Sequence, residues 1–165
     1  MDIQLFSTGG TIDKVYFDAK SAYEIGEPQT AGILREAGVA FSFEAEVLMQ
    51  KDSLDMTEAD RASIADAIRA CTAERVIVTH GTDTMADTAR TVDEALRAAG
   101  LHKTVVFVGS LTPARFKASD AEFNVGFAAA AVQTLPSGVY VAMNGRVFDP
   151  HTVRKSRERN RFESD

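Results

Sequence analysis

The sequence predicts an α/β domain with a flavodoxin-like parallel sheet, covered by helices on both faces in a three-layer arrangement. Segments with strand patterns alternate with segments of helical pattern along the 165 residues, which is the order that parallel sheets with crossover helices require. Residues 76–78 and 105–108 consist only of Val, Ile and Phe, a composition typical of strands buried on both faces. The length favours one domain, residues 1–165.

Local patterns predict the elements in chain order. Residues 39–49 alternate apolar and polar side chains, as a strand does, and residues 58–71 have an apolar helical face with Thr57 as N-cap. Residues 13–29 lack a firm period and are expected to form a loop, and the chain is expected to be irregular from Arg146 onward. The expected strands are 2–7, 39–49, 75–79, 104–109 and 138–143, and the expected helices are 30–37, 58–71, 85–99 and 121–135.

The expected strand order is 2-1-3-4-5, which places two polar turns face to face. In this order the chain reverses direction across the sheet between its first and third strands, and ligands bind beyond the carboxyl ends of strands at such a switch point. Those ends are residues 8–11 and 79–83, both rich in glycine and threonine. Glycines let the backbone approach a ligand, and backbone N–H groups there can stabilise an oxyanion. A threonine hydroxyl in this place becomes a nucleophile once a base removes its proton.

The composition excludes several classes of function. A formal net charge of −6 does not favour nucleic acid or an anionic membrane surface, and no apolar run is long enough to span a membrane. The N-terminus lacks the features of a secretion signal, and Cys71 is the only cysteine, so we expect a cytoplasmic protein. The three histidines lack metal-ligand spacing, and no nucleotide-binding glycine motif is present. We therefore expect no metal and no cofactor.

Two segments together resemble the signature segments of bacterial-type L-asparaginases, TGGTI at residues 8–12 and HGTDTM at residues 80–85. Further segments are similar to the family in the same order, so the resemblance covers essentially the whole chain. They are SAYEIG at residues 21–26, DSLDM at 52–56, VGSLTP at 108–113, the stretch 119–124, and the segment 143–155 that ends at a lysine. The resemblance implies an amidohydrolase whose small-molecule substrate is L-asparagine, with L-glutamine as a second substrate to test.

The resemblance also assigns roles to individual residues. Thr11 would be the nucleophile, assisted by Tyr23 from a mobile loop. Thr82, Asp83 and Lys155 would form a second triad, in which the lysine activates Thr82 or tunes the charge of the site. The motifs leave open which threonine attacks first. The expected substrate-binding residues are Gly10, Ser53, Leu54, Asp55, Gly81 and Ser110, with Ser53 at the α-carboxylate and Asp83 at the α-amino group.

The chain departs from the family pattern in its length and at Leu54. The family has a second, C-terminal domain, which closes the site of a neighbouring subunit and supplies an acidic residue to the substrate ammonium. No segment of the given sequence corresponds to that domain, and the sequence is interpreted either as a naturally short form or as a fragment. We expect a homodimer or homotetramer, because an open site needs a second copy of the chain to exclude water. The candidates for the acidic residue are then Glu158, Glu163 and Asp165 of the partner chain. Leu54 stands where the family often has a polar residue, which would weaken binding or alter the asparagine-to-glutamine preference.

Other functions stay open at this point. A non-catalytic amino-acid-binding or regulatory module would keep the same site without turnover. An amidotransferase-type amidase component would release ammonia for another protein. A flavin-binding module is a third candidate, on fold analogy only.

Several neighbouring residues are expected to be structural. His80 lies beside a polar turn, where a histidine is more often structural than catalytic. Phe116 and Phe123 are expected in the core, and Met85 and Met143 are expected to pack in the interior.

Overall fold

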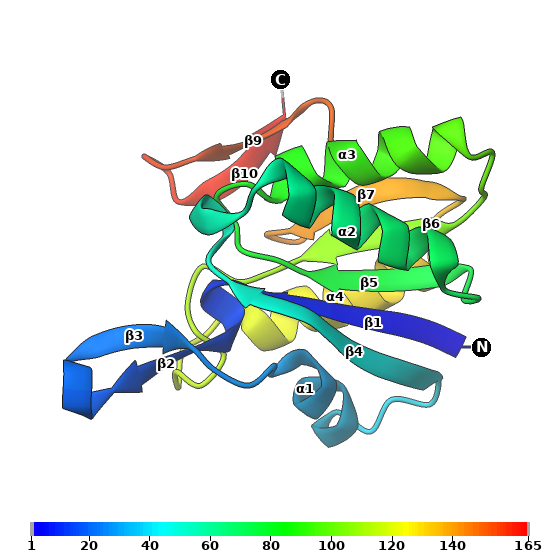
Figure 1. Cartoon of the computed structure of the whole chain (residues 1–165). Helices are drawn as coiled ribbons and strands as arrows, with labels where there is room; N and C mark the ends of the chain where they lie inside the picture. The colour runs from blue at the N-terminus through cyan, green and yellow to red at the C-terminus, as the bar shows by residue number, and fades with distance from the viewer. Residues whose placement is uncertain (1, 165) are drawn as a thin grey trace.

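The computed structural model describes residues 2–164, and its centre is a six-stranded sheet (Figure 1). The strand order is β4-β1-β5-β6-β7-β8, in which the first five strands are parallel and β8 is antiparallel. Counted along the chain, the parallel strands have the predicted order 2-1-3-4-5. The strands are β1 (Asp2–Gly9), β2 (Lys14–Phe17), β3 (Ala22–Ile25), β4 (Ser42–Lys51), β5 (Arg75–Thr79), β6 (Thr104–Val108), β7 (Gly138–Met143), β8 (Arg146–Phe148), β9 (Val153–Ser156) and β10 (Arg161–Ser164). The helices are α1 (Thr30–Glu36), α2 (Glu58–Ala70), α3 (Met85–Ala98) and α4 (Ala121–Thr134), with short 3-10 helices η1 (Thr11–Asp13), η2 (Asp18–Lys20) and η3 (Ser53–Asp55).

Helices cover both faces of the sheet, which confirms the predicted three-layer α/β class. Helices α2 and α3 pack on each other in front of the sheet, whereas α4 lies behind it and contacts α1 (Figure 1). The central strands supply the core between these layers. Residues 76–78 of β5 and 105–108 of β6 are all fully buried, as their uninterrupted apolar composition predicts.

The connection through α4 has an uncommon hand. Helices α3 and α4 both link neighbouring parallel strands in the same direction across the sheet, yet they lie on opposite faces (Figure 1). Their connections therefore have opposite hands, and β6–α4–β7 is the left-handed one, a hand found in only about 2% of such crossovers. As a result, the loop between β6 and α4 passes the carboxyl edge of the sheet beside β1, where the Ala114 N–H donates to the Ile12 carbonyl at 3.1 Å.

Two antiparallel hairpins lie outside the sheet, in segments that the sequence predicts to be irregular. Strand β2 pairs with β3, with Tyr16 opposite Tyr23, and this hairpin projects from the body of the domain (Figure 1). Strand β9 pairs with β10, and β8 pairs with β7. The predictions of a loop over residues 13–29 and of irregular chain after Arg146 are therefore wrong. Local pairing stabilises these strands, and none of them is long enough to show a clear apolar period.

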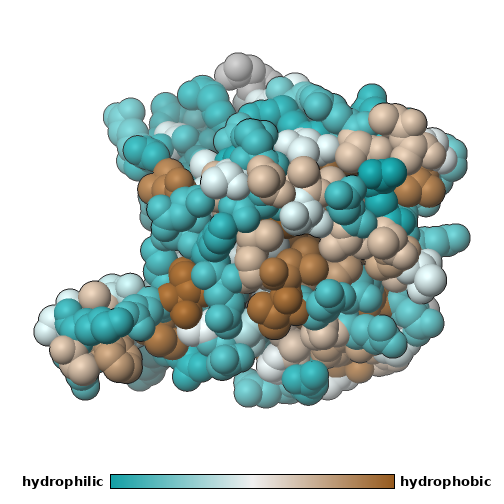
Figure 2. Space-filling model, viewed as in Figure 1, coloured by the Kyte–Doolittle hydropathy of each residue, from teal (hydrophilic) through white to brown (hydrophobic). Residues whose placement is uncertain are grey.

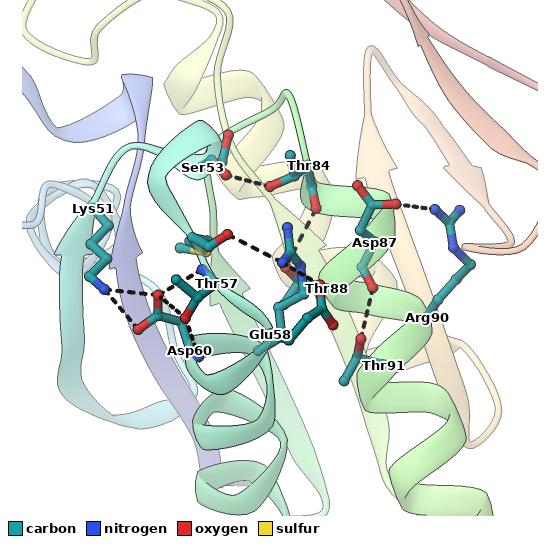
Figure 3. Close-up of polar contacts among 12 residues, drawn as sticks. Lys51, Ser53, Thr57, Glu58, Asp60, Thr84, Asp87, Thr88, Arg90 and Thr91 are labelled. Atoms are coloured by element: carbon teal, nitrogen blue, oxygen red, sulfur yellow. Dashed lines mark hydrogen bonds and ion pairs between the residues drawn. The ribbon is translucent and has the colours of Figure 1, made fainter.

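A capping box fixes the start of α2, in agreement with the prediction for Thr57. The Thr57 Oγ1 accepts from the Asp60 N–H at 3.2 Å, and the Asp60 carboxylate accepts from the Thr57 N–H at 2.8 Å (Figure 3). Lys51, at the end of β4, donates to both oxygens of Asp60 at 2.8 Å. The hydrogen bond from Lys51, followed by that from the Thr57 N–H, lowers the pKa of Asp60 to about 2. These contacts hold β4 against α2 and so position the η3 turn between them.

The surface contains two aromatic residues that were expected in the core. Phe116 is 44% exposed and Phe123 is 62% exposed, so that prediction is wrong, whereas Met85 and Met143 are fully buried as predicted. Phe123 instead stacks on Phe127 along α4, with ring centroids 6.3 Å apart. On the face in Figure 2, hydrophilic residues predominate and strongly hydrophobic residues form small groups. None of the helices within residues 2–164 has the length and apolar character needed to span a membrane.

Candidate active site

Three turns from different parts of the chain meet at the carboxyl edge of the sheet. A side-chain carbon added at Gly10, after β1, would overlap the backbone of Gly81, after β5. A side-chain carbon at Gly81 would in turn lie 2.7 Å from the Cβ and Oγ of Ser53 in η3. Gly10 has φ 94°, a conformation open to glycine and costly for other residues. The two polar turns predicted to face each other are therefore in contact, and η3 joins them.

Gly81→Ala is expected to lower the free energy of unfolding by about 2 kcal/mol, because the new methyl group overlaps Ser53 in a tightly packed place. Denaturant unfolding measures this change. Gly126→Ala is the matched control, since a side-chain carbon there meets nothing within 4 Å and alanine favours the helix. Equal unfolding midpoints for Gly81→Ala and the wild type would contradict the close contact of the turns.

Lys155 joins Thr82 and Asp83, the two residues that follow Gly81. Its Nζ donates to the Thr82 Oγ1 at 2.7 Å and to the Asp83 Oδ1 at 3.0 Å. Thr82 is 4% exposed, whereas the side chains of Lys155 and Asp83 are 18% and 27% exposed, so solvent reaches part of the cluster. Arg157 approaches the Asp83 Oδ1 to 3.7 Å from an exposed position. A threonine hydroxyl hydrogen-bonded to an amine is arranged for proton transfer whenever that amine is neutral.

The hairpin β9–β10 holds Lys155 in this position. Lys155 lies opposite Phe162, which is 3% exposed and anchors β10 in the core. The Phe162 N–H donates to the Asn144 Oδ1 at 2.9 Å, in the turn between β7 and β8. Asn144 has φ 55°, a left-handed conformation that asparagine tolerates. The charged run around Lys155, typical of a solvated face by its composition, is thus an ordered strand pair docked on the sheet.

Thr11 and Tyr23 belong to the segment that leaves β1. Thr11 is half-buried at the first position of η1, directly after Gly10. Tyr23 is 52% exposed on β3, and its ring contacts those of Tyr16 and Phe116 at centroid distances of 5.4 and 6.1 Å. The structure therefore places Thr11 at the base of the projecting hairpin and Tyr23 within an exposed aromatic group.

Ser53 has a buried hydroxyl group without a partner among the residues described. The residue is 1% exposed, and its Oγ makes no hydrogen bond in this part of the chain. Its carbonyl accepts from the Thr84 Oγ1 at 2.7 Å, which ties η3 to the start of α3 (Figure 3). Because leaving a buried hydroxyl unpaired costs about 1–3 kcal/mol, this oxygen is suited to bind a polar ligand group.

The other predicted binding residues lie in different environments. Leu54 is 63% exposed beside Ser53, and Asp55 is also exposed. Ser110 is fully buried, and its hydroxyl donates to the Thr112 carbonyl at 2.6 Å. Its side chain is therefore engaged within the loop that follows β6.

His80 supports the turn that carries Thr82. The residue is fully buried, its Nδ1 lies 2.7 Å from the Gly81 carbonyl, and its Nε2 lies 2.8 Å from the Thr88 Oγ1. Burial, only partly opposed by the hydrogen bond to Gly81, lowers the pKa of His80 to about 4. A neutral imidazole donates from Nδ1 to the carbonyl and accepts the Thr88 hydroxyl at Nε2. His80 therefore positions the turn, in agreement with the structural role expected for it.

Asp13 is a buried carboxyl group that sequence patterns did not indicate. It is 1% exposed, and its Oδ1 accepts from the Gln29 N–H at 2.9 Å, while its Oδ2 has no partner within the described residues. Burial raises the pKa of Asp13 to about 7, against the hydrogen bond from Gln29, which lowers it. Its carbonyl also accepts from the Gly26 N–H at 2.8 Å. Asp13 thus joins both ends of the hairpin β2–β3.

Two of the carboxylates proposed for closure by a partner chain, Glu163 and Glu158, lie within the described residues. Glu163 accepts from Arg161 at 2.8 Å and from Arg159 at 3.3 Å. Glu158 is exposed in the turn between β9 and β10, and Asp165 lies outside the described residues. Among residues 2–164, no three His, Cys, Asp or Glu side chains gather closely enough to hold a metal ion.

Known proteins resemble this chain both in sequence and in fold. The family model described as "Asparaginase, N-terminal" matches residues 2–164. A probable periplasmic L-asparaginase of Haemophilus influenzae is 32% identical over 94% of this chain and 46% of its own length. A glutamyl-tRNA(Gln) amidotransferase component of Saccharolobus islandicus is 32% identical over 92% of this chain and 35% of its own. L-asparaginase I of Vibrio cholerae superposes with a TM-score of 0.82 at 27% identity, over 99% of this chain and 51% of its own.

The fold and these likenesses define the chain as a three-layer α/β domain of the kind found in L-asparaginases. It belongs to the asparaginase family and corresponds to the family's N-terminal domain. The chain spans about half the length of the L-asparaginases it matches, 46% of the Haemophilus protein.

Proposed function

We propose that this domain is an L-asparaginase-type amidohydrolase, which hydrolyses L-asparagine to L-aspartate and ammonia through a threonine nucleophile and an acyl-enzyme. The observation that carries the proposal is the contact of the Lys155 Nζ with the Thr82 Oγ1 and the Asp83 Oδ1, at 2.7 and 3.0 Å. This cluster lies at the switch point of the sheet, where ligands bind in this class of fold. The family membership and the name of the Haemophilus relative support the same reaction.

The proposed reaction has two halves. In the first, the Thr11 hydroxyl loses its proton and attacks the side-chain carbonyl carbon of asparagine, and the C–N bond breaks as ammonia takes up a proton. In the second, water attacks the resulting ester, releases aspartate and returns the proton to Thr11. Tyr23 assists the first threonine, and neutral Lys155 activates the hydroxyl of Thr82. The opposite order, in which the Thr82 hydroxyl makes the first attack and forms the ester, is the alternative.

Substrate recognition follows from the same three turns. We assign the α-carboxylate to the unpaired Ser53 hydroxyl and the α-ammonium to Asp83. Backbone N–H groups of Gly10 and Gly81 are the proposed donors to the oxyanion, since their lack of side chains allows close approach. The backbone near Leu54, Asp55 and Ser110 completes the proposed pocket.

An amidase component of an amidotransferase is the second candidate. The Saccharolobus relative, named as part of a glutamyl-tRNA(Gln) amidotransferase, favours it by its 32% identity over 92% of this chain. Such a component would release ammonia strongly only in the presence of its partner protein.

We also propose that the protein is a cytoplasmic homodimer or homotetramer, in which a second copy of the chain excludes water from the site.

Ammonia release from asparagine and from glutamine at matched concentrations tests the proposed function. Wild-type protein is expected to release ammonia from asparagine, and Lys155→Met to lose nearly all of this activity because the Thr82 hydroxyl loses its base. Lys117→Met, in the exposed loop before α4, is the control and should retain wild-type rates. Asparagine binding without ammonia release would instead identify a non-catalytic module.

A further inference from the structure

The hairpin β2–β3 makes few contacts with the rest of the domain. Its strand residues are exposed or half-buried, and it projects away from the sheet (Figure 1). At its base, the carbonyl and the carboxylate of Asp13 accept from Gly26 and Gln29 at 2.8 and 2.9 Å. Segments with so few buried apolar contacts open at low free energy. The orientation of Tyr23 therefore depends on any further contacts between the hairpin and the turns of the site.

Lys14, the first residue of β2, makes such a contact. Its Nζ lies 2.7 Å from the Asp52 Oδ2, and the two side chains are 27% and 31% exposed. Partial burial strengthens an ion pair, because solvent screens it less. The same hairpin carries a contrasting pair, Lys20 and Glu24, which is also 2.7 Å apart but has side chains 65% and 42% exposed.

Asp52 is built into the turn that carries Ser53. It is the N-cap of η3, where its Oδ1 accepts from the Leu54 N–H at 3.2 Å and its carbonyl accepts from the Asp55 N–H at 3.0 Å. Burial alone would raise the pKa of Asp52, but the hydrogen bonds from Lys14 and Leu54 and the charges of Lys14 and Lys155 lower it below its ordinary value. The carboxylate is therefore ionised when it meets Lys14, and any displacement of Asp52 moves Ser53 with it.

We propose that the Lys14–Asp52 ion pair is a latch that holds the hairpin carrying Tyr23 against the turn carrying Ser53. Both residues are positioning residues: neither reacts, and each acts through the site residue beside it. The inference rests on the proposed asparaginase-type reaction, since it assigns the latch to the two residues that would assist the nucleophile and hold the α-carboxylate. It also explains why two charged side chains meet at this partly buried place.

A double-mutant cycle tests the latch. Lys14→Met and Asp52→Asn should each lower kcat/KM for asparagine by about tenfold, mainly by raising KM, because both free the hairpin from the binding turn. The double variant should lose no more than either single variant, since each change removes the same interaction. Lys14→Arg keeps the cation and should stay close to the wild type. Lys20→Met, which breaks the exposed pair on the same hairpin, is the matched control and should leave KM unchanged.

Hydrogen exchange gives a readout that does not need catalysis. Lys14→Met should speed amide exchange both in residues 14–26 and in residues 52–56, whereas Lys20→Met should change neither segment in this coupled way. Wild-type KM and wild-type exchange in Lys14→Met, or strictly additive losses in the cycle, would overturn the latch. If the wild type releases no ammonia, the proposed function fails and exchange alone decides: joint acceleration of the two segments supports the latch, and its absence refutes it.

Discussion

Thr82→Val is expected to lower kcat/KM for asparagine by at least about a thousandfold, because valine keeps the shape of threonine and removes the hydroxyl group. Thr82 is 4% exposed and bonded to Lys155, so valine fits the same space without a reacting oxygen. Thr11→Ala should cause a loss of similar size, since Thr11 lies directly after Gly10 in the turn that faces Thr82. Steady-state ammonia release measures both effects.

A matched control separates loss of chemistry from loss of fold. Thr91→Val, on α3, removes a hydroxyl that donates to the Asp87 carbonyl at 3.2 Å, away from the three turns (Figure 3). It should keep wild-type activity, and all three variants should unfold cooperatively, as the wild type does. Wild-type rates in both Thr11→Ala and Thr82→Val would rule out the threonine mechanism.

Asp13→Asn is expected to remove a component of the pH dependence of stability, worth up to about 4 kcal/mol between pH 4 and 7.5. The folded state keeps the Asp13 proton to about pH 7, whereas the unfolded carboxyl group releases it near 3.8. Between these values the folded state binds more protons. The contribution of Asp13 to the wild-type free energy of unfolding should therefore be most favourable below pH 4. This contribution should fall as the pH rises to about 7.

Denaturant unfolding of the wild type and of Asp13→Asn across this pH range measures the contribution of Asp13. The difference between their free energies of unfolding at each pH isolates it, because the other carboxylates contribute equally to both proteins. The asparagine carbonyl can still accept from the Gln29 N–H, so the hairpin keeps this contact. Asp18→Asn, an exposed carboxylate in the same segment, is the matched control. Parallel stability curves for wild type and Asp13→Asn would show that Asp13 is not buried as the structure has it.

The central sheet could be predicted because its residues carry strong and local signals. Residues 76–78 are apolar without interruption, and Thr57 with Asp60 forms a recognisable helix start. The strand order then brings residues 8–11 and 79–83 together by topology alone. The same patterns gave no sign that β6–α4–β7 is left-handed, since the hand of a crossover depends on the packing of whole layers.

The parts that escaped prediction are stabilised by pairing and by distant charges. The hairpin β2–β3 turns through Ser21 at φ 49°, a position usually marked by glycine or asparagine, and its aromatic residues are exposed. Lys155 lies in a run of arginines whose composition suggests a solvated chain, and only its similarity to the family indicated a role. The Lys14–Asp52 pair joins residues far apart in sequence, and no periodicity connects them.

The contact between Thr82 and Lys155 closes a separation of 73 positions along the chain. Contacts of this kind form late, because the entropy of closing the loop must be overcome before they stabilise anything. On the ribosome, the strands that build the sheet emerge first, and Lys155, the proposed base, emerges only with β9. A nascent chain can therefore assemble nearly all of its core before it holds both residues of the proposed catalytic pair. On the proposed mechanism, chemical competence would then arrive only after the central sheet has been synthesised.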